Sequence, residues 1–131
     1  MTIIVEKIKW IMLVSGALTC TMIYAALAPQ AALQASFGET LQGPLAEIVV
    51  RNWGVLITLV GAMLIYGAYN AAARELVLGV AGVSKLAFIL LVLAQGTRYL
   101  GQQAGIAIAL DAIWVVLFAL YLAAMRRTAA A

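Results

Sequence analysis

Four ionisable side chains lie within segments that are otherwise apolar enough to cross a membrane. They are Glu47, Arg51, Lys85 and Asp111, and their formal charges sum to zero. A charged side chain at the centre of a bilayer costs about 2.5–3.5 kcal/mol on insertion scales, so such residues usually pair with one another or mark a functional site. The sequence therefore predicts a polar cluster inside the membrane.

The first two members of this cluster lie on one face of a helix, because Glu47 and Arg51 are four residues apart. The same face continues through Gly54, Thr58 and Gly61. Small residues let a second helix approach closely and mark helix–helix contacts in membranes. We therefore expect the two charges to face the protein interior.

Of the other two charged residues, Asp111 is expected to lie at a depth in the membrane similar to that of Arg51, and Lys85 within reach of Asp111. At a rise of ~1.5 Å per residue, Arg51 lies about 9 Å, Asp111 about 11 Å and Lys85 about 18 Å inside the outer boundary. The difference of ~7 Å between Lys85 and Asp111 is within reach of a lysine stem. We expect all four charges to form one cluster that opens outwards. Asn52 would add a directional hydrogen bond, and Trp114, one turn beyond Asp111, would line a cavity.

The cluster has two interpretations. A salt-bridge cluster can determine which helices pair in a membrane. Alternatively, the charges bind a polar or anionic headgroup or relay protons, as intramembrane ionisable residues commonly do. Apolar packing would stabilise the bundle at least as well as a buried ion pair, which slightly favours a functional role.

Composition identifies a membrane protein. The 131 residues are 66% hydrophobic and only 10% charged, with a mean hydropathy of +1.10, whereas a soluble domain has about 25% charged residues. The chain contains no histidine and a single cysteine, Cys20. It therefore cannot form His-ligated haem, an ordinary zinc site, a Ser-His-Asp triad or an internal disulfide. We expect no metal and no cofactor, apart from a bound lipid or quinone.

The net charge of +3 and a pI near 9.3 do not indicate nucleic-acid binding, because the basic residues lie at helix ends rather than along a stripe. Anionic lipid headgroups are the better partner for such residues. A larger membrane complex and a homo-oligomer both remain open as assemblies.

Four segments are long and apolar enough to span the hydrocarbon core: about residues 8–28, 45–69, 76–97 and 104–125. We predict an all-α integral membrane four-helix bundle that forms one domain over residues 1–131. Short connectors should make neighbouring helices antiparallel. The first segment resembles a signal peptide, but proline directly after its Ala-Leu-Ala site disfavours cleavage, so we expect a permanent span.

Flanking charges predict the orientation. Five of the basic residues fall on one side of the membrane, which should place both termini in the cytoplasm: Lys7, Lys9, Arg74, Arg126 and Arg127. The first loop then faces outwards. Its Leu33 and Phe37 share one face of a short interfacial helix that Gly38 would end. This helix is either a lid over an outward-facing cavity or a simple connector.

The pattern Glu47-x3-Arg51-Asn52-x-Gly54 opens the second of four spans, and about residues 5–125 fit the same layout. In this the chain resembles the DoxX-like superfamily of small bacterial membrane proteins. The resemblance implies an inner-membrane four-helix bundle and an association with quinone-linked oxidoreductases. Because this chain lacks histidines and a redox cysteine pair, it would be an accessory or binding subunit.

The sequence thus favours a non-enzymatic inner-membrane protein that is an accessory subunit or binds a lipid-like or quinone-like molecule. Arg51 and Lys85 would face an anionic or carbonyl group, while Glu47 and Asp111 hold these cations in place. One alternative is a small oligomeric transporter or channel in which Lys85 and Asp111 titrate. Another is a membrane-embedded enzyme with Glu47 and Asp111 as acid and base.

Overall fold

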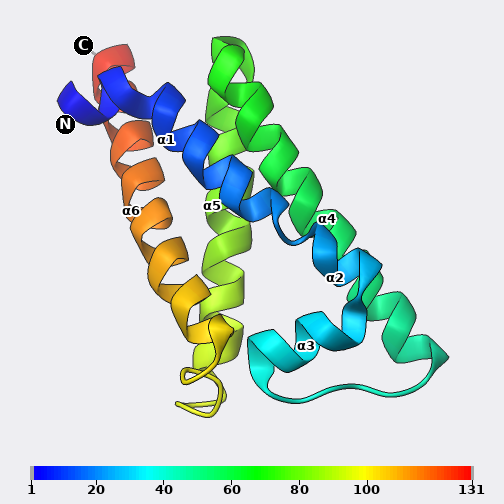
Figure 1. Ribbon diagram of the computed structural model, residues 1–131. Helices are drawn as coiled ribbons and strands as arrows, with labels where there is room; N and C mark the ends of the chain where they lie inside the picture. The colour runs from blue at the N-terminus through cyan, green and yellow to red at the C-terminus, as the bar shows by residue number, and fades with distance from the viewer. Residues whose placement is uncertain (1, 131) are drawn as a thin grey trace.

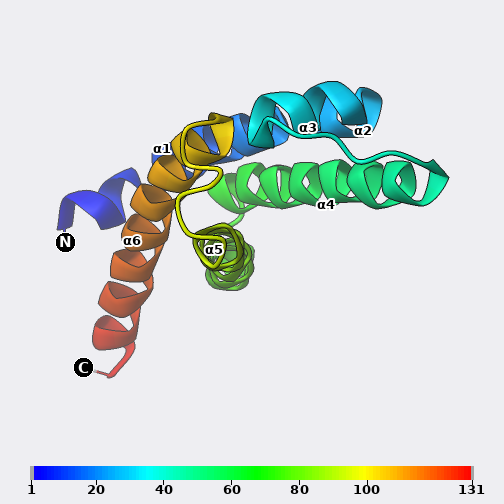
Figure 2. The ribbon, with the colours of Figure 1, turned by 90° about the horizontal axis from the view of Figure 1, so that it is seen from below.

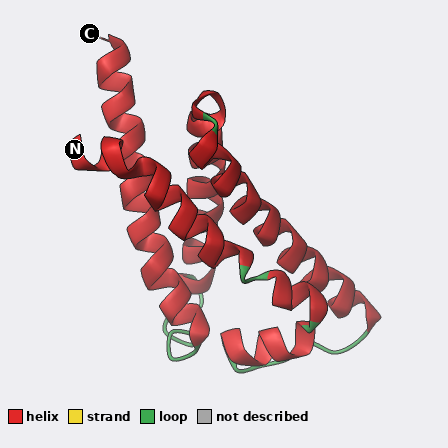
Figure 3. Ribbon diagram, turned by 45° about the horizontal axis from the view of Figure 1, so that its top comes forward, coloured by secondary structure: helices red, strands yellow, loops and turns green. Residues whose placement is uncertain are grey.

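The computed structural model describes residues 2–130, and within this range the chain is all-α, with no strand (Figure 3). Six helices follow one another: α1 (Thr2–Cys20), α2 (Ile23–Leu27), α3 (Pro29–Phe37), α4 (Pro44–Tyr69), α5 (Ala71–Leu93) and α6 (Gln103–Ala130). Four segments of the described chain are long and apolar enough to cross a membrane: α1 together with α2, α4, α5 and α6. The protein is a multi-pass membrane protein.

The four long segments alternate in direction, so neighbours along the chain are antiparallel and both termini lie at one end (Figure 1). The short helix α3 crosses the opposite end. Seen along α5, helices α4 and α6 diverge from it at different inclinations (Figure 2). The predicted four-helix arrangement is confirmed, although the helices are splayed rather than parallel.

Glycines bring α4 into direct backbone contact with both α1 and α2. A Cβ atom added to Gly61 would lie 2.8 Å from the carbonyl oxygen of Gly16, and one added to Gly54 would lie 2.6 Å from the backbone nitrogen of Ala26. This is the small-residue packing found between membrane helices. The prediction that the Gly54–Gly61 face of the second span contacts another helix is confirmed.

The hydrophobic core occupies the half of the bundle that contains the termini. Fully buried side chains from four helices meet there, namely Met12, Leu64, Leu78 and Phe118. Because this half is filled by apolar side chains, any internal space must lie in the other half, beneath α3.

The sequence predicted one continuous span over residues 8–28, but the structure divides this segment into two helices. It begins at Thr2, turns at residues 21–22 and resumes as α2. Thr19 donates to the carbonyl of Ser15 at 2.7 Å, and Thr21 donates to that of Leu18 at 2.6 Å. Threonine hydroxyls that bond the preceding turn in this way bend helices.

Proline separates α2 from α3. Pro29 has no N–H, so it cannot continue the hydrogen bonding of α2, but it is well suited to the first turn of α3. The new helix ends at Gly38, whose φ of 72° is left-handed. A short helix in the first loop, ended by Gly38, is therefore confirmed. Phe37 at its end packs on Trp53 and Tyr99, with ring centroids 6.1 and 5.3 Å apart.

The third span begins at Ala71 rather than near residue 76, because Asn70 alone connects α4 to α5. The Asn70 side chain accepts hydrogen bonds from the N–H groups of Ala72 and Ala73, which caps α5. Arg74 donates to the carbonyl oxygens of Gly67 and Ala68 at 3.1 and 2.9 Å, which caps the end of α4. Of residues 70–75, which lie between the predicted spans, all but Asn70 thus belong to α5. That helix ends at Leu93, four residues earlier than expected.

Candidate functional site

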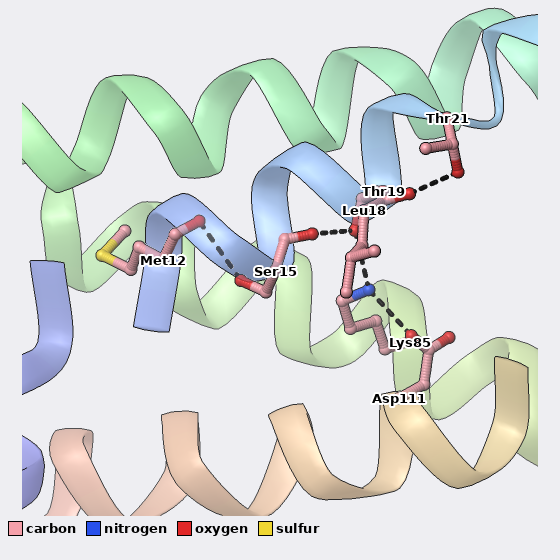
Figure 4. Close-up of polar contacts among 7 residues, drawn as sticks. All are labelled: Met12, Ser15, Leu18, Thr19, Thr21, Lys85 and Asp111. Carbon is pink, nitrogen blue, oxygen red and sulfur yellow. Dashed lines mark hydrogen bonds and ion pairs between the residues drawn. The ribbon is translucent and has the colours of Figure 1, made fainter. Parts of the chain in front are cut away.

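A buried lysine joins three helices at the centre of the bundle. Lys85 on α5 is 7% exposed, and its Nζ donates to Asp111 Oδ1 on α6 at 2.9 Å and to Thr19 Oγ1 on α1 at 3.1 Å (Figure 4). The pairing of Lys85 with Asp111, predicted from helix depth, is confirmed. An ammonium removed from water requires this combination of an opposite charge and a further acceptor.

Thr19 was missed at the level of sequence, although it completes this site. Its hydroxyl donates to the carbonyl of Ser15, so its lone pairs are free to accept a hydrogen bond from Lys85. The available signal was the spacing of Ser15 and Thr19, two polar residues on one face of an apolar segment.

Glu47 and Arg51 do not join this site, so the prediction of a single four-residue cluster is wrong. Arg51 Nη2 lies 2.7 Å from Glu47 Oε1, and the two side chains are 44% and 50% exposed. Within the described residues, no hydrogen bond or ion pair connects them to Lys85 or Asp111. Residue counting gave the depth of each charge but not the direction in which its side chain points.

Arg51 instead forms a hydrogen bond with the first span, at the point where that span is interrupted. Its Nη1 donates to the carbonyl oxygen of Ala26 at the end of α2. Because Pro29 interrupts the helical hydrogen bonds there, the last carbonyls of α2 lack the partners that a continuous helix would give them. A guanidinium at a helix C-terminus satisfies such carbonyls and complements the helix dipole. Asn52 is exposed, and its side chain forms no hydrogen bond with the other residues of the described chain.

The role of Arg51 can be tested by replacing it with methionine, which keeps most of the stem. We expect this change to destabilise the protein by about 1–3 kcal/mol, since it leaves a carbonyl in the bundle without a donor. The matched control is Glu47→Gln, which changes an exposed side chain and should alter stability by no more than about 0.5 kcal/mol. Thermal melting in detergent measures both. Equal losses in the two variants would contradict a capping role.

A cavity of about 390 Å³ lies between the helices in the half remote from the termini. Its polar lining comes from all helices except α4: Thr19, Thr21, Tyr24, Ser36, Ser84, Lys85, Gln103 and Asp111. Trp114, expected to line a cavity, is among the walls and also packs against the hydrophobic core. The Lys85–Asp111 pair is therefore accessible from a largely apolar chamber.

The short helix α3 lies at the end of the bundle remote from the termini (Figure 1), and its Ser36 lines this chamber. Glu39 binds Arg98 through a 2.6 Å contact between Oε1 and Nη2, and this hydrogen bond, followed by the carboxylate charge, raises the pKa of the Arg98 guanidinium. Trp53 and Phe88 line both the cavity and an adjoining apolar groove of about 300 Å³. The chamber therefore has an apolar extension between α3, α4 and α5.

The lining limits the chemistry of the site. Glu47 is not part of the cavity wall, so Glu47 and Asp111 do not form an acid–base pair there. No group of three or more histidine, cysteine or acidic residues that would hold a metal occurs within residues 2–130. The polar groups that face the apolar space are one ion pair, several hydroxyl groups and the Gln103 amide.

Comparison of the chain with protein-family models, with curated protein sequences and with solved structures found no match. The resemblance to the DoxX-like superfamily therefore stays a prediction from the sequence.

Proposed function

We propose that this multi-pass protein is a non-enzymatic component of the bacterial inner membrane that binds a lipid-like or quinone-like amphiphile in the chamber at Lys85 and Asp111. As an accessory subunit, it would hold this molecule for a larger membrane complex. The observation that carries the proposal is a chamber of about 390 Å³ with apolar walls and a charged pair inside it. Ligand sites are typically apolar cavities with a few convergent polar groups.

The accessibility of the ion pair supports binding over simple helix pairing. A salt bridge that only fixes helix contacts is best sealed by apolar neighbours, because any gap around it weakens packing. Here Asp111 keeps 19% of its side chain exposed, and both partners line the chamber.

The closed inner end of the chamber favours binding over conduction. Met12, Leu78 and Phe118 are fully buried between the ion pair and the end that contains the termini. A water-filled path through one chain would have to displace this core. The proposal therefore ranks a transporter or channel, which needs Lys85 and Asp111 to titrate along such a path, below a binding protein.

The distribution of basic residues predicts which side of the membrane the chamber faces. The end of the bundle that contains both termini is formed by the beginnings of α1 and α5 and the end of α6 (Figure 1). These helix parts carry five basic residues, Lys7, Lys9, Arg74, Arg126 and Arg127. By the positive-inside rule, this end faces the cytoplasm. The chamber and α3 then lie in the outer half of the membrane, where a ligand can enter from the outer leaflet.

Filling the chamber tests the proposal. We expect native mass spectrometry of gently extracted protein to show a retained small molecule, and Ala107→Phe, which projects into the chamber, to reduce its occupancy at least tenfold. The control is Ala112→Phe, an exposed position on the same helix that does not line the chamber. Absence of a small molecule from the unmodified protein would contradict the binding proposal, whereas larger retained subunits would identify an assembly component.

A further inference from the structure

The charged proton donor of the chamber, Lys85, is largely committed within the protein. Lys85 Nζ carries three protons; one is donated to Asp111 and a second to Thr19, and only 8% of the side chain is exposed. Arg51 is absent from the chamber wall. The expectation that Arg51 and Lys85 together face an anion or a carbonyl group therefore does not fit this geometry.

The accessible charged atom is instead an acceptor. Asp111 binds Lys85 through Oδ1, while Oδ2 forms no hydrogen bond with any residue of the described chain and points away from Lys85 (Figure 4). An ionised carboxylate only accepts hydrogen bonds. In an apolar chamber, an acceptor without a partner is costly, so Oδ2 favours a ligand that supplies an O–H or N–H group.

The charges of Lys85 and Asp111 limit which ligand group can donate a hydrogen bond to Asp111 Oδ2. The Lys85–Asp111 pair is neutral overall, so an ammonium bound to Oδ2 would lie beside the Lys85 ammonium, and an anion would meet the Asp111 carboxylate. Burying either charge also costs desolvation energy that the neutral pair cannot offset. A neutral hydroxyl donates to Oδ2 without either penalty. The hydroxyl-bearing residues that also line the chamber, Ser84 and Tyr24, are themselves neutral.

We infer that the chamber selects an amphiphile with a neutral hydroxyl head, an alcohol or a phenol, which donates its proton to Asp111 Oδ2. This inference rests on the proposed function and specifies its ligand. For a quinone-like ligand, it means that the dihydroxy form binds more tightly than the dicarbonyl form, since only the former has an O–H group.

Matched probes test the inference with the intact protein in detergent. Tryptophan fluorescence reports binding, because Trp53 and Trp114 line the chamber. The probes share a dodecyl chain on a benzene ring and differ only in the head: phenol, methyl ether, carboxylate and ammonium. We expect the phenol to bind at least tenfold more tightly than each of the other three.

Variants test whether the preference for the phenol depends on the Lys85–Asp111 pair. The double variant Lys85→Met/Asp111→Leu removes the pair without leaving a buried charge, and it should bind phenol and methyl ether within about twofold of each other. Glu47→Gln, outside the chamber, should keep the tenfold preference. If the unmodified protein binds the methyl ether or the carboxylate as tightly as the phenol, the inference is overturned while the proposed function stands. If it binds none of the probes and retains no small molecule, both are overturned.

Discussion

Replacing Asp111 by leucine is expected to lower the melting temperature of the protein in detergent by roughly 10 °C or more. The substitution leaves Lys85, which is 7% exposed, without its counter-charge and with Thr19 as its remaining acceptor. Removing one partner of a buried ion pair typically costs about 3–5 kcal/mol, because the other charge stays buried and unpaired. This is the largest effect that a single polar substitution should have here.

The same experiment contains its own control. In the double variant Lys85→Met/Asp111→Leu both charges are gone, and we expect most of the lost stability to return, since apolar residues of similar volume can replace a buried pair. If the double variant melts as low as Asp111→Leu, leucine disrupts packing at position 111. The loss of stability is then not caused by an unpaired Lys85 charge.

The second large effect should come from a single methyl group. In Gly61→Ala, the new Cβ would lie 2.8 Å from the Gly16 carbonyl oxygen and 2.8 Å from the Cys20 backbone nitrogen. Backbone atoms cannot move aside as a side chain can, so α1 and α4 would have to separate along their closest contact. We expect a loss of about 1–3 kcal/mol or more from overpacking, seen as a lower melting temperature and a lower yield of folded protein.

Two other glycines provide the matched control. A Cβ added to Gly79 or Gly82 on α5 meets no atom within 4 Å. Alanine is also the better helix former, so Gly79→Ala and Gly82→Ala should melt at the original temperature or slightly above it. If all three alanine variants melt alike, the close approach of α1 and α4 does not stabilise the bundle.

The parts of the structure that were predictable from sequence depend on position along a helix axis. Hydropathy located four spans, small residues located the face of α4 that contacts another helix, and rise per residue brought Lys85 and Asp111 to compatible depths. These properties follow from counting residues along a regular helix. The short helix before Gly38 was equally accessible, because Pro29 and Gly38 mark its two ends.

The errors concern rotation about the axis and breaks in the helix. Arg51 has nearly the depth of Asp111, yet its side chain turns towards Ala26, a carbonyl made available only because α2 ends there. α2 ends there because Pro29 begins α3. The separate break between α1 and α2 lies where Thr19 and Thr21 bond the preceding turn, and hydropathy does not detect such bonds in an apolar segment. The second acceptor of Lys85, Thr19, was missed for the same reason.

The hydrogen bonds of the α4–α5 turn have a consequence for how the protein is made. They involve only residues 66–74: Asn70 with Tyr66, Ala72 and Ala73, and Arg74 with Gly67 and Ala68. This reversal can therefore form as soon as that short stretch leaves the ribosome, in line with N-terminal parts folding first during synthesis. Lys85 must wait for Asp111, 26 residues later in translation. A nascent or truncated chain without α6 thus carries an unneutralised lysine among apolar helices, a distinction that membrane quality control can use between unfinished and finished molecules.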